Sequence, residues 1–239
     1  MRKIFIISIS IFLLQFQNIF ADFDAGFGIV IPLGASISQS YQDHKLGVNN
    51  SGKLTSDVGF EWGIGITPGL YNGFDDYLGF SISLDLAYHR DVFSYKEIKA
   101  FGNSDYKNVK TTYYFDTLVI GILPKLNIAN FFIGIGAGVK LALAGEEITQ
   151  NYNANYNQFE NANYSYNLND IKNKYKTFVI PYIKITLDHL FLFSDDTALG
   201  IGIYAGYDFG PKLRDDRFTK NDLGAFDIGG QISFYFVDN

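Results

Sequence analysis

The sequence contains no cysteine, which excludes disulfide bonds, zinc sites with cysteine ligands, thiol catalysis and a lipidated N-terminal cysteine. Charged residues are also scarce, at 18% of the chain against the ~25% usual in soluble domains. The formal net charge of −6 argues against a nucleic-acid partner. Aromatic residues, by contrast, reach 17%, and the 239 residues suffice for one large β domain.

Long apolar runs are absent after the N-terminus. Arg2 and Lys3 precede an apolar run over residues 4–14, and Ala21 ends a short segment after it. This order of charge, apolar run and small residue is typical of a secretory signal peptide. The run is also shorter than the ~17–20 residues that a spanning helix needs. We therefore expect residues 1–21 to be removed and residues 22–239 to form one exported domain.

Residues 131–144, FFIGIGAGVKLALA, show the pattern that organises the rest of the chain. Alternate positions carry large apolar side chains, and the positions between them carry mostly glycine and alanine, with Lys140 among them. Since a β-strand points alternate side chains to opposite faces, one face is apolar and the other is small. The segment exceeds the roughly 9–11 residues with which a tilted strand crosses a bilayer. A face with so little side-chain volume is typical of the inside of a narrow barrel.

The same alternation recurs along the chain, which predicts about eight strands. The segments are 24–39, 58–67, 78–89, 111–123, 131–144, 179–187, 199–209 and 226–236. In 111–123 two registers compete, and a β-bulge would reconcile them. Long polar connections, predicted as loops at 42–53, 90–109, 145–174 and 210–222, alternate with short turns, including one at 124–130.

Alternating hydrophobicity also fits a soluble lipocalin-like barrel. Three features favour a transmembrane barrel: the bulky apolar face lies opposite the glycines, the connections segregate by length, and aromatic residues gather near strand ends, as in the girdles at the two bilayer interfaces. The first predicted girdle contains Phe27, Tyr71, Tyr77, Phe80, Phe131, Phe191, Phe193, Phe234 and Phe236. The second contains Tyr41, Tyr88, Phe93, Tyr113, Tyr207, Phe209 and Phe226.

In this pattern the chain resembles small bacterial outer-membrane β-barrels, namely the transmembrane domain of OmpA and its relatives OmpX and OmpW. The resemblance covers nearly the whole of 22–239 and implies an all-β, antiparallel, up-and-down barrel in the outer membrane, with both termini in the periplasm. The ending with Phe234 and Phe236 is similar to the signal read by the barrel-assembly machinery, although Val237, Asp238 and Asn239 follow. The partners implied are outer-membrane lipid and that machinery, and we expect a monomer.

Charged residues on the small face are expected inside the barrel, because a lysine facing lipid near the midplane would cost ~2–4 kcal/mol. They are Glu61, Asp85, Lys140, Lys184 and Asp208. Two interpretations are open: an ion-selecting ring, or a structural network that fills the lumen. We favour the network, since eight strands leave an interior that side chains fill. Glu61 and Asp85 would repel each other, so Lys140 is expected to bridge them.

Neither a cofactor nor a metal site is expected. The three glycines of 131–144 lack the spacing of a dinucleotide fingerprint, and no metal-ligand spacing is present. A lipid-modifying outer-membrane enzyme remains an alternative, because His44 with Ser51, and His89, lie toward the outer face. No acidic partner is fixed by spacing, so we do not expect an enzyme.

The longest connection, 145–174, is rich in asparagine and tyrosine and almost free of aliphatic side chains at its centre. Such a segment cannot bury its own core and is expected to be mobile and exposed outside the cell. Its aromatic residues, Tyr152, Tyr156, Phe159, Tyr164 and Tyr166, suit an adaptable contact surface. The sequence thus favours a surface protein whose loops contact an unidentified extracellular ligand or mediate adhesion. The alternative is a narrow channel for small or apolar solutes.

Overall fold

A computed structural model describes residues 23–44, 54–72, 77–101, 105–153, 158–212, 214 and 218–238. The predicted signal peptide lies outside the described residues. The elements are β1 (Asp24–His44), β2 (Leu54–Ser56), β3 (Val58–Asn72), β4 (Leu78–Phe101), β5 (Asp105–Ile128), β6 (Phe131–Asn153), β7 (Gln158–Tyr166), α2 (Leu168–Lys174), β8 (Val179–Ser194), β9 (Thr197–Asp208) and β10 (Phe218–Asp238).

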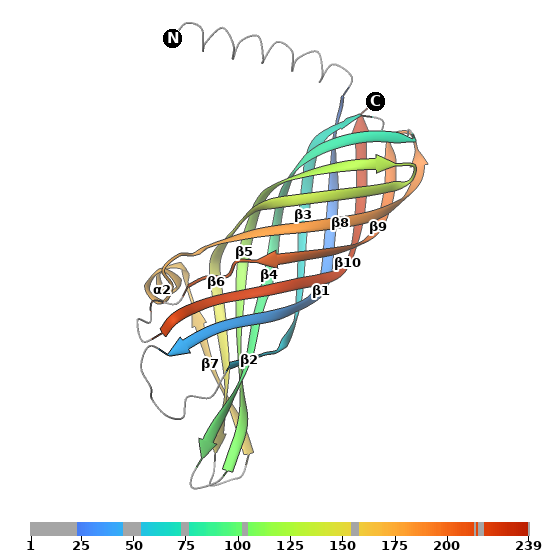
Figure 1. The fold of residues 1–239 in the computed structure, drawn as a ribbon. Helices are drawn as coiled ribbons and strands as arrows, with labels where there is room; N and C mark the ends of the chain where they lie inside the picture. The colour runs from blue at the N-terminus through green and yellow to red at the C-terminus, as the bar shows by residue number, and fades with distance from the viewer. Residues whose placement is uncertain are drawn as a thin grey trace, which may run out of the picture.

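Eight of the ten strands close into a ring (Figure 1). The order around it is β1, β3, β4, β5, β6, β8, β9 and β10, and β10 pairs with β1. Every neighbouring pair is antiparallel. The predicted up-and-down barrel is therefore confirmed.

The alternation read from the sequence decides which side chains face the lumen, meaning the interior of the ring. In β6, Phe132 is fully buried and Gly134 and Gly136 are buried, whereas Ile133 and Ile135 point outward, the latter 67% exposed. The other strands likewise expose isoleucine, leucine and phenylalanine on the outer surface. The ring thus carries an apolar belt outside, and glycine, polar and some large aromatic side chains inside. Among the described residues, no helix has both the length and the apolar character needed to cross a membrane.

The two ends of the ring differ. Both described chain ends lie at one end, where Ala25 pairs with Asp238 (Figure 1). The turns Ala129–Asn130 and Asp195–Asp196 connect strands at this same end. The first is shorter than predicted, because β5 continues to Ile128.

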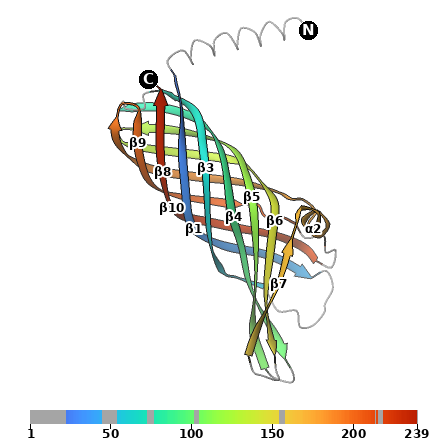
Figure 2. The same ribbon diagram turned by 180° about the vertical axis from the view of Figure 1, so that it is seen from behind.

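At the opposite end, two predicted loops are in fact largely strands. The segment 90–109 extends β4 and β5, which pair as far as Phe101 with Asp105. The segment 145–174 contains the end of β6, the returning strand β7 and the helix α2. Together with β2, these extensions form a sheet that stands beyond the ring, here called the projecting sheet (Figures 1 and 2). Pairing with neighbouring strands satisfies the backbone groups of these polar segments without a core of their own, which the composition alone did not indicate.

The prediction of a bulge within 111–123 is wrong: the additional residue lies in β6, which pairs with β5. Asp116 pairs with Ala144 and Thr117 with Ala142, so Leu143 is the additional residue. β5 itself keeps one alternation: Phe115, Thr117 and Val119 are buried in the lumen, whereas Leu118 and Ile120 point outward. The two competing registers were the two faces of a single regular strand.

Candidate functional site: a filled lumen and a projecting sheet

The middle of the lumen is held by Lys140. Its Nζ donates to Asp91 Oδ1 and to Asp208 Oδ2, each at 2.6 Å, and all three side chains are almost completely buried. Thr117 Oγ1 donates to the second oxygen of Asp91 at 2.6 Å, and His89 Nδ1 lies 3.6 Å from its first oxygen. The lysine therefore joins carboxylates from opposite parts of the ring.

The predicted bridge from Lys140 to Glu61 and Asp85 is wrong. Asp85 instead pairs with Lys184 at 2.6 Å and accepts a hydrogen bond from the Tyr182 hydroxyl. Glu61 accepts a hydrogen bond from the Tyr204 hydroxyl at 2.9 Å. The prediction failed because β4 does not end at residue 89, so it missed the carboxylate of Asp91.

Two tyrosines explain the glycine-rich face. Tyr182 lies against Gly121 and Gly138, and Tyr204 lies against Gly34 and Gly229, so that a Cβ at any of these glycines would collide with the ring or its hydroxyl. The glycines therefore make room for two large side chains that cross the lumen. The sequence indicated the small face correctly but not what occupies the space.

A second buried network lies nearer the chain ends and was missed from the sequence. Lys125 Nζ donates to the Tyr235 hydroxyl at 2.6 Å and lies 3.3 Å from Asp188 Oδ2. Gln231 Nε2 donates to the other oxygen of Asp188 at 2.6 Å. Lys125 lies in the segment predicted as a turn, and Asp188 directly follows the predicted strand 179–187. Their alternation with the small-face residues of the same strands would have placed them in the lumen.

Apolar clusters close the lumen above and below these networks. The cluster at the end of the ring from which the projecting sheet extends contains Phe93, Tyr95, Phe115, Ala142, Ile171, Tyr175, Ile180, Leu223 and Ala225. The cluster at the chain ends is Tyr71, Phe132, Leu190, Ala198, Tyr235 and Val237. Between them remains a cavity of about 40 Å³, lined by Glu61, Asp85, Lys140 and other lumenal side chains. This space accommodates a few water molecules and is not an open pore.

The helix α2 contributes to the closure at the projecting-sheet end. Asn167 caps its N-terminus, accepting from the backbone of Asp170, whose side chain accepts in turn from the Asn167 backbone. Ile171 and Tyr175 are fully buried in the apolar cluster. The helix therefore lies over the lumen because Ile171 and Tyr175, the residue after its last turn, insert there.

A polar cluster fixes α2 to the sheet. Lys174 Nζ and the Tyr166 hydroxyl both donate to Glu147 Oε2. Burial opposes ionisation of this carboxyl, but the hydrogen bonds from Lys174 and Tyr166 prevail and lower the pKa of Glu147. Tyr166, predicted to be a surface-loop residue, is instead half-buried in this cluster.

The projecting sheet exposes side chains on both faces of β7. Phe159 and Tyr164 are 46% and 58% exposed. The side chain of Tyr152 and the whole of Tyr156 lie outside the described residues. The predicted mobile loop is therefore a paired hairpin in its described part, with nine residues of β7 in continuous register with β6. A surface built on paired strands is more rigid than a free loop of the same composition.

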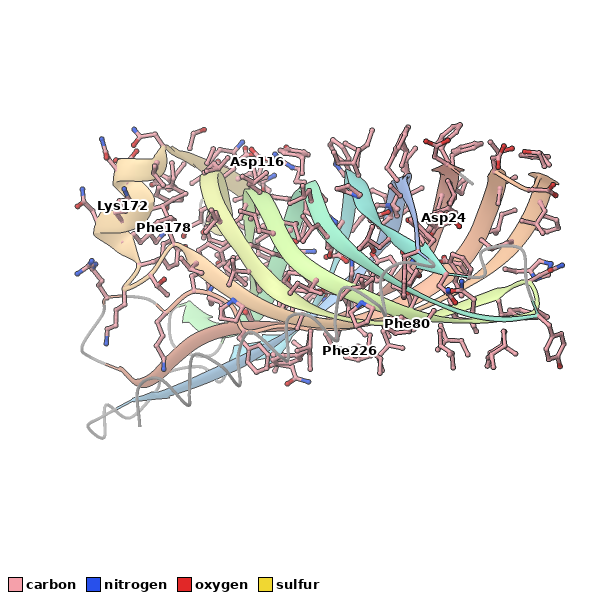
Figure 3. All side chains as sticks on the ribbon, turned by 90° about the horizontal axis from the view of Figure 1, so that it is seen from above. Asp24, Phe80, Asp116, Lys172, Phe178 and Phe226 are labelled. Carbon is pink, nitrogen blue, oxygen red and sulfur yellow. The ribbon has the colours of Figure 1, made fainter. Side chains whose placement is uncertain are left out.

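Most of the aromatic residues assigned to girdles point outward. At the chain-end level these are Phe27, Tyr77, Phe80, Phe131, Phe191, Phe193, Phe234 and Phe236, and at the other level Tyr88, Tyr207, Phe209 and Phe226. The outward positions of Phe80 and Phe226 are visible in Figure 3. The side chain of Tyr41 is outside the described residues.

Three girdle assignments are wrong. Tyr71 and Phe93 are buried in the lumenal clusters, and Tyr113 packs against the cluster under α2. Each lies on the inward alternation of its strand. Proximity to a strand end does not determine the face on which a side chain lies, whereas alternation along the strand does.

Of the residues considered for catalysis, only His89 has a described side chain. His89 faces the lumen beside Asp91, whereas the side chain of His44 and the whole of Ser51 are outside the described residues. His189 packs between Phe131 and Phe191 on the outer surface. In the described part of the chain, no three histidine, aspartate or glutamate side chains are grouped to hold a metal ion.

No protein-family model matches the sequence, and no curated protein matches it. Among solved structures, the chain is similar to Neisserial surface protein A, at 12% identity and a TM-score of 0.41, over 87% of this chain and 95% of that one. It is similar to the outer membrane protease OmpT from Escherichia coli, at 8% identity and 0.44, over 92% and 98%. It is also similar to Ail, the attachment invasion locus protein of Yersinia pestis, at 15% identity and 0.34, over 88% and 99%. These similar structures are small outer-membrane β-barrel proteins, and the fold of this chain itself follows from its closed ring of eight strands.

Proposed function

We propose that this chain is an outer-membrane protein whose ring serves as an anchor and whose projecting sheet is a contact surface outside the cell. The observation that carries the proposal is the contrast between the two parts. Apolar clusters and ion pairs fill the ring, whereas the projecting sheet exposes both faces of β7. A filled ring has little capacity to transport solutes, and an exposed polar and aromatic sheet suits contact with other molecules.

The orientation follows from the connections. Short turns face the periplasm and long connections face outward in bacterial outer-membrane barrels. The end with Ala129–Asn130, Asp195–Asp196 and both described chain ends is therefore assigned to the periplasm. We further propose that residues 1–21 are removed on export, and that the barrel-assembly machinery recognises the last strand, where Phe234 and Phe236 point outward.

Conductance separates an anchor from a narrow channel for small or apolar solutes. We expect the purified protein in planar bilayers to give no stable single-channel steps. Regular steps in wild type that change when Lys140 or Lys184 is neutralised would show an open lumen and overturn the anchor.

The contact role is tested on cells that carry either the full chain or a variant in which Asn-Gly replaces residues 151–160. This change shortens the β6–β7 hairpin to a two-residue turn and leaves the ring intact. We expect the full chain to increase attachment to surfaces coated with extracellular-matrix protein, and the variant to lose the increase at equal surface amount. Equal attachment by both would remove the hairpin from the contact surface. Unchanged membrane lipid composition in cells that express the full chain would argue against a lipid-modifying enzyme.

A further inference from the structure

Two carboxyl groups in the lumenal cavity each keep an oxygen without a hydrogen-bond partner among the described residues. They belong to Glu61 and Asp227, which are 2% and 4% exposed. Glu61 Oε1 accepts a hydrogen bond from the Tyr204 hydroxyl at 2.9 Å, whereas Glu61 Oε2 and Asp227 Oδ1 accept none. Both side chains line the cavity of about 40 Å³ in the middle of the ring. The cavity thus contains two buried acceptors for which the described side chains supply no donor.

The strand pairing brings these two carboxyl groups to neighbouring levels of the ring. Glu61 on β3 pairs with Gly34 on β1, and Asp227 on β10 pairs with Ser36, two residues further along β1. Gly34 and Ser36 lie on the same, lumenal face of β1, because side chains alternate along a strand. On the other side of Asp227 lies Gly206 of β9, which also lines the cavity. Glycine and serine occupy little volume, so they leave space beside the Asp227 carboxylate.

The cations nearby are already paired with other carboxylates. Lys140 bonds Asp91 and Asp208. Lys184 bonds Asp85. Carboxylates therefore outnumber cations among the described side chains around the cavity, even when the histidine is counted as protonated. The carboxylates are Glu61, Asp85, Asp91, Asp208 and Asp227, and the cations are Lys140, Lys184 and His89. Uncompensated charge in a buried site is strongly unfavourable, so a further positive charge is needed there.

A hydrated divalent cation fits the charge, the size and the ligands of this cavity. Glu61 and Asp227 carry two negative charges when ionised, and a divalent ion balances both. No three acidic or histidine side chains are grouped as metal ligands in the described part of the chain, so protein ligands alone do not enclose an ion. Mg²⁺ is usually held by only one or two carboxylates and keeps part of its water shell. At roughly 10–15 Å³ for each water-sized species, the cavity of about 40 Å³ holds one ion with about two waters.

We propose that the lumenal cavity binds one Mg²⁺ ion between Glu61 and Asp227. Glu61 Oε2 and Asp227 Oδ1 are its protein ligands, and water molecules complete its coordination. Apolar clusters close the lumen on both sides of the cavity, so the ion is taken up as the ring forms and exchanges slowly. It is a structural ion that neutralises buried carboxylates, and it is not transported. The inference concerns the ring alone and does not depend on what the projecting sheet contacts.

Metal content tests the site directly. The purified full chain is refolded into a neutral detergent with Mg²⁺, passed through a gel-filtration column to remove free ion, and analysed by inductively coupled plasma mass spectrometry. We expect wild type to retain about one Mg²⁺ per chain and Glu61→Gln/Asp227→Asn to retain none. The matched control is Asp116→Asn/Glu146→Gln, which also removes two carboxylates, here from ion pairs with Arg90 in which they are 28% and 32% exposed. It should retain the ion as wild type does.

Unfolding in urea gives an independent measurement. At a free Mg²⁺ concentration 100 times its dissociation constant, the folding equilibrium constant of wild type should be about a hundredfold larger than in chelator. The variant Glu61→Gln/Asp227→Asn should not respond to Mg²⁺. In chelator it should be at least as stable as wild type, because it no longer buries the two charges. Asp227→Asn alone should also lose the retained ion, which keeps the test available if the double variant does not fold.

Three results of the metal analysis would overturn the site: wild type without retained Mg²⁺, equal retention by wild type and the Glu61→Gln/Asp227→Asn variant, or equal loss in the control. Wild-type stability that ignores Mg²⁺ but falls as the pH rises would show that protons, rather than a metal ion, neutralise the two carboxyl groups. That result would likewise overturn the site.

Discussion

Replacing Lys140 by methionine should strongly destabilise the barrel. The lysine side chain is 5% exposed, and its Nζ lies 2.6 Å from oxygens of both Asp91 and Asp208. Methionine retains most of the volume but removes the cation, so two carboxylates stay buried and uncompensated. Breaking a buried ion pair in this way costs about 3–5 kcal/mol. Equilibrium unfolding in urea, followed by tryptophan fluorescence of protein refolded into vesicles, measures the loss.

Two further variants identify the cause of that loss. Lys140→Met/Asp208→Asn should recover part of the stability, because one of the two carboxylates becomes neutral. Lys184→Met should cost less than Lys140→Met, since Lys184 is 20% exposed and its partner Asp85 also accepts from Tyr182. A midpoint for Lys140→Met equal to that of wild type, with unchanged slope, would show that the lysine is solvated and would refute the closed lumen.

Three further predictions concern the lumenal glycines, the docking of α2 and the β6–β7 hairpin. Gly34→Ala should destabilise the barrel by about 1–3 kcal/mol in the same urea assay, because its Cβ would collide with the Tyr204 hydroxyl. Gly200→Ala should cost less, since the atom nearest to its added Cβ is 3.1 Å away. Equal unfolding midpoints for the two variants would contradict this account of the glycines. The depressed pKa of Glu147 means that its contribution to docking α2 is complete above its ordinary value of 4.5 and is lost as the pH falls through the folded pKa. The protection of α2 amides from exchange, taken relative to the intrinsic rate at each pH, should therefore fall in acid in wild type but not in Glu147→Gln. Chymotrypsin added to intact cells should cleave only within the β6–β7 hairpin, and cleavage that requires lysed cells would reverse the proposed orientation.

The barrel could be predicted from the sequence alone, because strand alternation is a local property. A period of two in apolar side chains is visible in residues 131–144 without knowledge of any neighbouring strand. About eight such strands, each with an apolar outer face, are typical of a closed transmembrane barrel. The same rule was sufficient to place Glu61, Asp85, Lys140 and Lys184 in the lumen, where the structure has them.

Which of these groups pair with one another depends on the three-dimensional arrangement of the strands. A lumenal lysine reaches across the ring, so its partner depends on the stagger of strands that are far apart in the sequence, as for Lys140 and Asp208. The extent of the strands was likewise not encoded by hydrophobicity. In β7, beyond the ring, side chains on both faces are exposed, so polar and aromatic residues occur on both and the apolar alternation disappears. There, pairing between backbones makes the strand, and composition predicts a loop.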